Sequence, residues 1–411
     1  MKAEVIAIGS ELTCGARLDT NSQWLSQQLE ALGWTVQRHT TVSDDHEAMI
    51  RVYQEAARRS RVVLITGGLG PTLDDITRET LAAAFNEPLV EDADALRHIE
   101  ALFQSRGRDM PERNRVQALR PQSSISLHNA HGTAPGILME RHDPHCTIAV
   151  MPGVPAEMKR MFLEQLVSVL PGSGVFVRRT VIRTFGLGES DTERLLGDLT
   201  GRGRNPEVGI TASEAVISLS VTARAGSAAE CDLLTDAVCD DIRSRLGETV
   251  FGADEVELHQ VVAESLIQRG QTIAALEGST TGGLIGQWLT DDDARATCLS
   301  HCQVFATAAA MFADTSADAA SWEAAMREQG QRLLQNGTAD YVLMSSPGAL
   351  VVDASGVRRQ QGIIIVMGPG VDICQDVSMT GNLAIFRQRA ARTALNQVRL
   401  HLLKENVRSV I

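Results

Sequence analysis

The residues best suited to chemistry form one stretch of the chain, Thr66-Gly67-Gly68-Leu69-Gly70-Pro71-Thr72-Leu73-Asp74-Asp75. It follows the apolar run Val62–Ile65, which is typical of a buried parallel strand, and precedes a helix expected through Thr77–Phe85. Three glycines let the backbone approach an anion closely, and N–H groups at the helix start point toward that anion. The two adjacent aspartates indicate a divalent cation, because hard oxygen ligands suit Mg²⁺ or Mn²⁺, which favour phosphate-containing substrates. In the alternative interpretation, the glycines only shape a turn and the aspartates cap the helix.

Polar, glycine-rich loops also lie beside two further predicted strands, Val5–Ile8 and Thr147–Met151. Since ligands of open α/β sheets bind outside the carboxyl ends of the strands, we expect these loops to converge on one edge of the sheet. Together they predict a phosphate-containing ligand with a metal, although the glutamates among them could simply be partners of helix dipoles. The loop residues are Gly9-Ser10-Glu11 with Asp19-Thr20-Asn21, then Gly132-Thr133-Ala134-Pro135-Gly136, and Pro152-Gly153-Val154-Pro155 with Glu157.

The elements that position these loops alternate between strand and helix over residues 1–170, which predicts an α/β fold with a doubly wound, mostly parallel sheet. Within it, Asp44 and Glu47 are expected to form a capping box for a helix that ends at Arg59. Residues 171–254 predict a small α+β module, with a helix over Ala228–Leu246 and a capping box at Ser190 and Glu193. Residues 255–411 predict a third, α/β domain.

Composition limits the classes of partner and the cellular location that we expect for this chain. The 411 residues carry 38 Lys plus Arg against 51 Asp plus Glu, a formal charge of −13, and only 4% are aromatic. We therefore expect no nucleic acid partner. No apolar stretch approaches the roughly 20 residues that span a bilayer, so no membrane partner is expected. Seven scattered cysteines and an N-terminus without the apolar core of a signal peptide favour the cytoplasm.

The N-terminal motifs resemble those of the competence/damage-inducible CinA family in order and spacing. They are Gly9-Ser10-Glu11-Leu12, Asp19-Thr20-Asn21, the stretch 66–75, Gly132–Gly136 and Pro152–Met158. The resemblance implies a molybdopterin-biosynthesis-like domain at 1–170, a KH-like module at 171–254 and a CinA-type deamidase-like domain at 255–411. It also implies that the N-terminal domain hydrolyses ADP-ribose to AMP and ribose 5-phosphate with a divalent cation (Mg, Mn or Co). For the C-terminal domain it implies deamidation of nicotinamide mononucleotide, and for the whole chain a homodimer. Both activities belong to pyridine-nucleotide salvage.

The implied hydrolysis assigns roles to the N-terminal residues. A metal on Asp74 and Asp75 would neutralise a pyrophosphate, polarise phosphorus and deliver a water. Glu11 or Asp19 would position that metal or take the proton of the water, and the sequence does not choose between them. The expected phosphate- and nucleotide-binding residues are Thr66, Gly67, Gly68, Gly70, Thr72, Gly132, Thr133 and Gly153.

The C-terminal domain departs from the family's pattern. Where the family has Ala-Glu-Ser-Cys-Thr-Gly-Gly, this chain has Glu277–Gly283, which keeps Ser279 but holds Gly278 and Thr280 at the Glu and Cys positions. The family's downstream lysine aligns with Ala310, and its Gly-rich loop is replaced by Ser345–Ala349. Because a serine needs a nearby base to become a nucleophile, we expect Ser279 to be vestigial and the deamidase activity to be lost or altered. The domain would then serve dimerisation or regulation.

Two alternatives to the hydrolase remain open at this stage. The same fold handles molybdopterin adenylylation, so a transferase-like activity on a pterin or nucleotide is the first. The second is a ligand-sensing or interaction protein in which both sites have drifted from catalysis.

Overall fold

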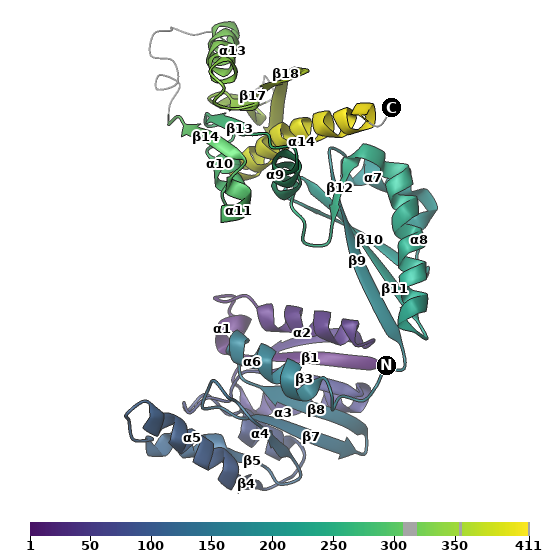
Figure 1. Ribbon diagram of the computed structural model, residues 1–411. Helices are drawn as coiled ribbons and strands as arrows, with labels where there is room; N and C mark the ends of the chain where they lie inside the picture. Colours follow the sequence, from purple (N-terminus) through teal and green to yellow (C-terminus); the bar gives the residue numbers. More distant parts are fainter. Residues whose placement is uncertain (307–318, 353–355, 410–411) are drawn as a thin grey trace. The chain divides into compact units, whose positions relative to one another are not determined.

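The computed structural model describes residues 1–306, 319–352 and 356–409. The chain forms two compact units, Met1–Arg178 with Arg224–Asp232, and Arg179–Ala223 with Leu233–Ile411 (Figure 1). Among the described residues, no helix is both long and apolar enough to cross a membrane.

The first unit is built on a six-stranded sheet with the order β2-β1-β3-β8-β7-β6. The four strands β2, β1, β3 and β8 are parallel, whereas β7 and β6 pair in antiparallel fashion. The doubly wound, mostly parallel sheet expected from the sequence is thus confirmed. The strands are β1 (Lys2–Ile8), β2 (Thr35–Val42), β3 (Val62–Thr66), β6 (Ile125–Leu127), β7 (Gly136–His142) and β8 (His145–Met151), and β4 (Leu89–Glu91) and β5 (Leu119–Pro121) form a separate pair.

Helices cover both faces of this sheet (Figure 1). Along β3, Val63 and Ile65 join a core cluster with Tyr53 of α3, while Leu64 joins a second cluster with Leu25 of α2. Alternate side chains of a strand point to opposite faces, so a continuous apolar run can be buried on both sides. The helices are α1 (Ser10–Thr13), α2 (Thr20–Ala31), α3 (His46–Arg59), α4 (Thr77–Ala84), α5 (Ala93–Ser105) and α6 (Pro155–Met161).

The register of the central strands brings three strand ends together. Ala7 of β1 lies beside Thr66 of β3, and Thr66 lies beside Met151 of β8. The loops that begin at Gly9, Gly67 and Pro152 therefore leave the sheet side by side. This arrangement brings the predicted site loops to one edge.

Three local details differ from the sequence-based expectations. The cap of α3 is Asp45, which accepts from Ala48 N at 2.8 Å, so the predicted capping box of Asp44 is wrong. The cap of α7 (Glu189–Leu196) is Gly188 rather than Ser190, and it makes no side-chain hydrogen bond. The segment Pro155–Leu170, which the sequence predicts as one helix, is an α-helix only to Met161 and continues as a π-helix over Phe162–Leu166. In each case the sequence correctly predicted a helix but not the residue at one of its ends. Helix ends are the least predictable part of a helix, because the terminal turns often depart from regular α-helical geometry.

The remainder of the chain contains two further sheets. A four-stranded sheet with the order β10-β11-β9-β12 packs its apolar side on α8 (Ala228–Leu246), so that Ile217, Leu219 and Val221 contact a core containing Ile242. Its strands are β9 (Phe176–Phe185), β10 (Glu207–Ser213), β11 (Val216–Ala225) and β12 (Val250–Ala253).

The C-terminal sheet has the order β14-β13-β15-β17-β16, with β18 paired to β17. Its strands are β13 (Ile273–Glu277), β14 (Leu299–Val304), β15 (Tyr341–Ser345), β16 (Ala349–Val352), β17 (Arg358–Gly368) and β18 (Val371–Thr380). The helices are α9 (Leu258–Gln268), α10 (Leu284–Leu289), α11 (Asp293–Ala296), α13 (Ala319–Gln335) and α14 (Leu383–Ser409). With these elements, the predicted fold class is confirmed throughout the described chain.

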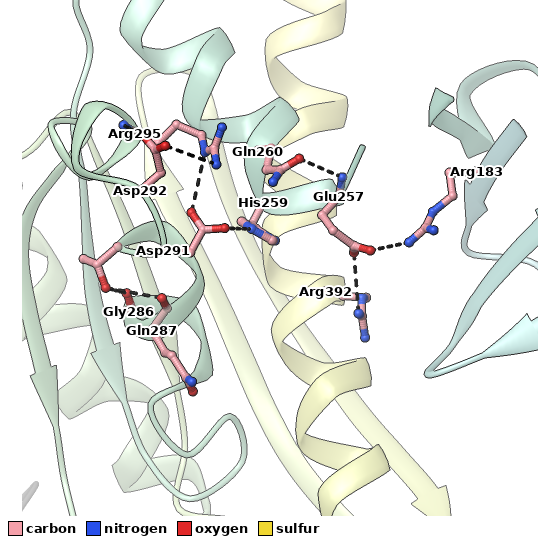
Figure 2. A network of polar contacts seen from close by, with 11 residues as sticks. Arg183, Glu257, His259, Gln260, Gly286, Gln287, Asp291, Asp292, Arg295 and Arg392 are labelled. Atoms are coloured by element: carbon pink, nitrogen blue, oxygen red, sulfur yellow. Dashed lines mark hydrogen bonds and ion pairs between the residues drawn. The ribbon is translucent and has the colours of Figure 1, made fainter. Parts of the chain in front are cut away.

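A network of charged side chains joins the four-stranded sheet β10-β11-β9-β12 to α9 and α14 within the second unit (Figure 2). Glu257 at the start of α9 pairs with Arg183 of β9 and lies 3.7 Å from Arg392 of α14. Arg392 also donates to the main-chain oxygen of Glu214 at 2.8 Å. His259 of α9 also lies 3.0 Å from Asp291, a contact that connects α9 to the segment after α10. Ion pairs of this kind, partly shielded from water, fix orientation more than they add stability.

An ion pair between buried Glu4 and the partly exposed Arg59 fixes β1, whose end carries one of the site loops. Glu4 has no exposed surface and accepts from Arg59 at 2.6 and 2.9 Å. We predict that Arg59→Met lowers the free energy of opening of β1 by about 3 kcal/mol, because the carboxylate stays buried without its cation. Hydrogen exchange at the β1 amides measures this loss.

The matched control is Arg51→Met. Arg51 lies on the same helix, its side chain is 64% exposed, and its guanidinium lies 3.5 Å from Glu47, so a change below about 0.5 kcal/mol is expected. Equal losses in the two variants would contradict a special role for the Glu4–Arg59 pair.

Candidate functional site

A cavity of about 410 Å³ lies at the edge where β1, β3 and β8 end. A smaller one, of about 100 Å³, shares Glu11, Arg17 and Gly153 with it. Of the predicted site residues, the larger cavity brings together Glu11, Gly67, Gly68, Gly70, Asp74, Asp75, Thr133 and Gly153. Asp19 and Thr66 line the smaller cavity, and Thr72 and Gly132 line neither.

The glycine-rich loop begins with two residues that only glycine fits. Gly67 and Gly68 have φ angles of +108° and +64°, and a Cβ atom on Gly68 would overlap the hydroxyl of Thr77. Glycine adopts such positive φ values readily, whereas residues with a Cβ atom rarely do. The conformation of the loop therefore depends on glycine at both positions.

The first residue of α4 holds the loop carbonyls. The Thr77 hydroxyl donates to Gly67 O at 3.0 Å, and the Thr77 N–H donates to Gly68 O at 3.2 Å. In a trans peptide the C=O and N–H groups point in opposite directions, so the N–H groups of Gly68 and Leu69 point away from α4. In the described part of the chain, the N–H groups of Gly68, Leu69 and Gly70 donate to no protein atom. They are available to a bound anion.

The two predicted metal ligands, Asp74 and Asp75, differ in their hydrogen bonds and in their exposure. Asp75 accepts from Thr72 N at 2.9 Å and from the Thr72 hydroxyl, and thereby closes the end of the loop. Asp74 is exposed, and the side chain of Thr72 together with the Asp74 N–H lowers the pKa of its carboxyl. Asp74 therefore carries its negative charge throughout the physiological pH range.

Carboxylates dominate the charge around the cavity. Besides the two aspartates, Glu11, Asp44 and Glu157 line it, and Arg17 is the single cation among its described lining residues. A phosphate would be repelled by this set unless a cation joined it.

The donor set fits a hard divalent cation in part. Carboxylate oxygens suit such an ion, but among the described residues no group of three or more His, Cys, Asp or Glu side chains could hold a metal by itself. Phosphate oxygens and water would have to complete the coordination, which is how Mg²⁺ is commonly bound.

Hydrogen bonds to the carboxylates fix the neighbouring loops. Asp44 accepts from the N–H and hydroxyl of Ser10 at 2.9 and 2.8 Å, which ties the loop before α3 to the loop after β1. Glu157 accepts from Asn129 at 2.7 Å, and a Cβ atom on Gly132 would overlap its carboxylate. The small residue at 132 therefore makes room for Glu157.

Thr66 and Asp19 make contacts within the protein. The Asn21 amide donates to Thr66 Oγ1 at 3.0 Å and to Gly153 O at 2.9 Å, and Thr66 Oγ1 donates to Pro152 O at 3.1 Å. Asp19 caps α2 by accepting from Ser22 N at 2.9 Å. These bonds join the strand ends to one another beneath the cavity.

Three polar residues of this site, Arg17, Asp44 and Gln117, were not predicted as site residues from the sequence. Arg17 carried a signal, since it is a lone cation between Glu11 and Asp19. Asp44 was assigned to a helix cap, and nothing local distinguishes that role from a position in the cavity. Gln117 arrives from a distant segment, the 3₁₀ helix Glu112–Ala118, and has no motif around it.

The C-terminal Ser279 lies just beyond the end of β13. Its Oγ accepts from the Gly348 N–H at 2.7 Å, and its main-chain oxygen accepts from Arg387 at 3.0 Å. In the described part of the chain, no titratable side chain forms a hydrogen bond with this hydroxyl. The aligned position of the family's lysine, Ala310, lies outside the described residues.

Glu277, the carboxylate nearest to Ser279 in the sequence, is occupied by hydrogen bonds from the main chain. Glu277 is fully buried and accepts from the N–H groups of Ile285 and Gly286 at 3.1 and 2.7 Å, so its carboxylate stabilises the start of α10. Neither group forms part of a nucleophile–base pair in the described residues.

Comparison with known families agrees with this architecture. Residues 4–172 match a family described as "Probable molybdopterin binding domain", and residues 179–252 match "Damage-inducible protein CinA KH domain". The molybdopterin-biosynthesis-like fold and the KH-like module expected from the sequence are thus confirmed.

Individual proteins are similar over longer stretches. A CinA-like protein from Crocosphaera subtropica is 40% identical over 292 residues, 69% of this chain and 69% of that protein. One from Dictyoglomus turgidum is 39% identical over 293 residues, 71% of this chain and 70% of that protein. A crystal structure of the protein CinA with unknown function from Thermoplasma acidophilum is 31% identical and covers 41% of this chain and 97% of that one, with a TM-score of 0.38.

The geometry of the loop makes a prediction about anion binding. We expect Gly68→Ala to weaken binding of inorganic pyrophosphate with Mg²⁺ by at least about tenfold, equivalent to roughly 1.4 kcal/mol, because the added Cβ displaces Thr77 and rotates the loop. The measurement is the rise in melting temperature on adding pyrophosphate, which reports ligand affinity.

Gly107→Ala is the matched control. Gly107 also has a positive φ of +67°, but a Cβ atom there meets nothing within 4 Å, so the backbone strain is similar and the loop is untouched. An equal rise in melting temperature for Gly68→Ala and Gly107→Ala would contradict the assignment.

Proposed function

This chain belongs to the family of CinA-like proteins, and on that basis we propose that its N-terminal domain hydrolyses ADP-ribose or a related nucleotide diphosphate with a divalent cation. The observation that carries the proposal is the set of three N–H groups at Gly68, Leu69 and Gly70, which lack protein acceptors in the described residues and adjoin exposed carboxylates. Donors for an anion next to ligands for a cation suit a diphosphate bound with a metal.

Charge balance supports a diphosphate with a metal over a phosphate alone. The described lining residues include five carboxylates and one arginine, so a bare polyanion would meet a negative surface. A divalent cation held by Asp74 and Asp75 would neutralise the charge of this pair, and the loop N–H groups would bind phosphate oxygens. When bound, such a cation polarises phosphorus and lowers the pKa of a coordinated water.

Among the two candidate bases, Glu11 is the better one. Glu11 lines both cavities, whereas the carboxylate of Asp19 is engaged as the cap of α2. In the proposed step, water oxygen forms a bond to phosphorus, the bridging P–O bond breaks, and Glu11 accepts the proton of the water. The products of ADP-ribose would be AMP and ribose 5-phosphate.

Arg17 and Asp44 have supporting roles in this scheme. Arg17 would neutralise the phosphate that the loop does not contact, because it is the cation that both cavities share. Asp44 holds Ser10 and thereby fixes the start of α1, which carries Glu11. We further propose, from the family resemblance, a cytoplasmic homodimer that acts in pyridine-nucleotide salvage.

The C-terminal domain is proposed to have no deamidase activity. The support is the absence, in the described residues, of a titratable partner for the Ser279 hydroxyl, together with the alanine at position 310. A serine hydroxyl without a base is a weak nucleophile.

The proposed hydrolysis can be tested directly. Purified protein with ADP-ribose and Mg²⁺, Mn²⁺ or Co²⁺ should release AMP, and Asp74→Asn should lower kcat/KM by at least about 100-fold through loss of charge stabilisation. Product release is followed by chromatography of AMP.

The control for Asp74→Asn is Glu47→Gln, which removes one negative charge from an exposed position on α3 (84% exposed). Its rate should match that of the wild type. No AMP with any of the metals would contradict the hydrolase. Tight binding of a pterin would then favour the transferase, and ligand binding without turnover would favour a sensor.

The proposed loss of activity in the C-terminal domain can be tested separately. The full-length protein should release no ammonia from nicotinamide mononucleotide above the rate of the uncatalysed reaction, and Ser279→Ala should leave that rate unchanged. Turnover by the wild type that disappears in Ser279→Ala would overturn this part of the proposal.

A further inference from the structure

Arg78, the second residue of α4, is a buried cation directly beneath the glycine-rich loop. It is 1% exposed. Its Nη1 donates to Gly70 O at 3.2 Å and its Nη2 donates to Leu69 O. Its Nε is buried and has no hydrogen-bond partner in the described residues.

No carboxylate of the described residues forms an ion pair with Arg78. Burial lowers the pKa of the guanidinium to about 10, while the more distant charges of Glu79 and Asp75 oppose that shift. At neutral pH the side chain is therefore still a full cation. A buried cation held only by carbonyl oxygens is costly, because its lost hydration is not balanced by an opposite charge.

The two carbonyls that Arg78 holds continue the pattern set by Thr77. Thr77 fixes the carbonyls of Gly67 and Gly68, and Arg78 fixes those of Leu69 and Gly70. Because the Leu69 carbonyl faces α4, the N–H of Gly70 in the same peptide faces the opposite way. The next residue, Pro71, has no N–H, so Gly70 is the last donor in the run.

Resting on the proposed function, we propose that Arg78 is a positioning residue for the diphosphate: its guanidinium fork fixes the Leu69 and Gly70 carbonyls so that the loop N–H groups face the ligand. Its positive charge lies beneath the loop and finds its missing counter-charge in the bound diphosphate. The fork matters because a planar guanidinium bridges two carbonyls in a fixed geometry, which a point-like ammonium does not reproduce.

Gln117 supports the same orientation from another direction. It is 2% exposed, donates to Leu69 O at 3.4 Å, and accepts from Asn114 at 2.9 Å. Two buried side chains from separate segments thus hold one loop carbonyl, and Gln117 also lines the cavity.

The experiment compares Arg78→Lys and Arg78→Met with the wild type and with Arg51→Lys, an exposed control on α3. The dissociation constant for inorganic pyrophosphate with Mg²⁺ is measured by calorimetry, and kcat and KM are measured with ADP-ribose. We expect Arg78→Lys to weaken pyrophosphate binding about tenfold and Arg78→Met about 100-fold, with Arg51→Lys unchanged.

The kinetic readout separates positioning from simple structural damage. Because the loop contacts the phosphates in the ground state and in the transition state alike, KM should rise in Arg78→Lys in parallel with the dissociation constant, while kcat changes less than about threefold. The melting temperature of Arg78→Lys should stay close to that of the wild type. If Arg78→Met does not fold, Arg78→Lys decides the question.

The outcomes are distinguishable from those of the proposed function. Pyrophosphate affinity and KM at wild-type values in folded Arg78→Lys would overturn the positioning role, and so would an Arg78→Lys variant that does not fold. A wild-type protein that does not bind pyrophosphate would overturn it as well. Pyrophosphate binding that depends on Arg78, without ADP-ribose hydrolysis by the wild type, would support this inference and contradict only the proposed reaction.

Discussion

The carbonyl groups of Gly67, Gly68, Leu69 and Gly70 all accept hydrogen bonds from the first two residues of α4. The consequence follows from peptide planarity alone: the N–H groups of the loop point the other way, where three of them have no acceptor in the described residues. The positive φ angles at Gly67 and Gly68 make this conformation possible. The register of β1, β3 and β8 then brings the neighbouring loops around those donors.

Electrostatics gives the same site a second requirement. A chain with a net charge of −13 places five carboxylates and a single arginine around the cavity, with a buried arginine below the loop. A diphosphate and a divalent cation satisfy the donors and the carboxylates together, whereas either alone leaves one set unbalanced. This is why the proposed substrate is a metal-bound nucleotide diphosphate rather than a simple phosphate.

The sequence predicted the fold well because long periodic segments carry strong signals. The alternation of strands such as Val62–Ile65 with amphipathic helices predicted the fold class, and the glycine-rich stretch predicted a loop that lines the cavity. Boundaries were less certain, because Asp44 and Asp45 are equally good caps and only tertiary contact with Ser10 separates them. Arg17, Gln117 and Arg78 were not foreseen, since their roles depend on which carbonyl or cavity they meet after folding. Thr66 shows the converse: its hydroxyl suggested a ligand contact, yet it joins Asn21 and Pro152.

In the proposed complex, the N–H groups of Gly68, Leu69 and Gly70 bind the diphosphate. The most direct test is nuclear magnetic resonance of full-length protein labelled with ¹⁵N at glycine and leucine, titrated with ADP-ribose and Mg²⁺. We expect large downfield shifts of these three amide protons, because each gains a charge-assisted hydrogen bond. The amide proton of Gly107 should change little. Shifts confined to other residues, or none at saturation, would contradict it.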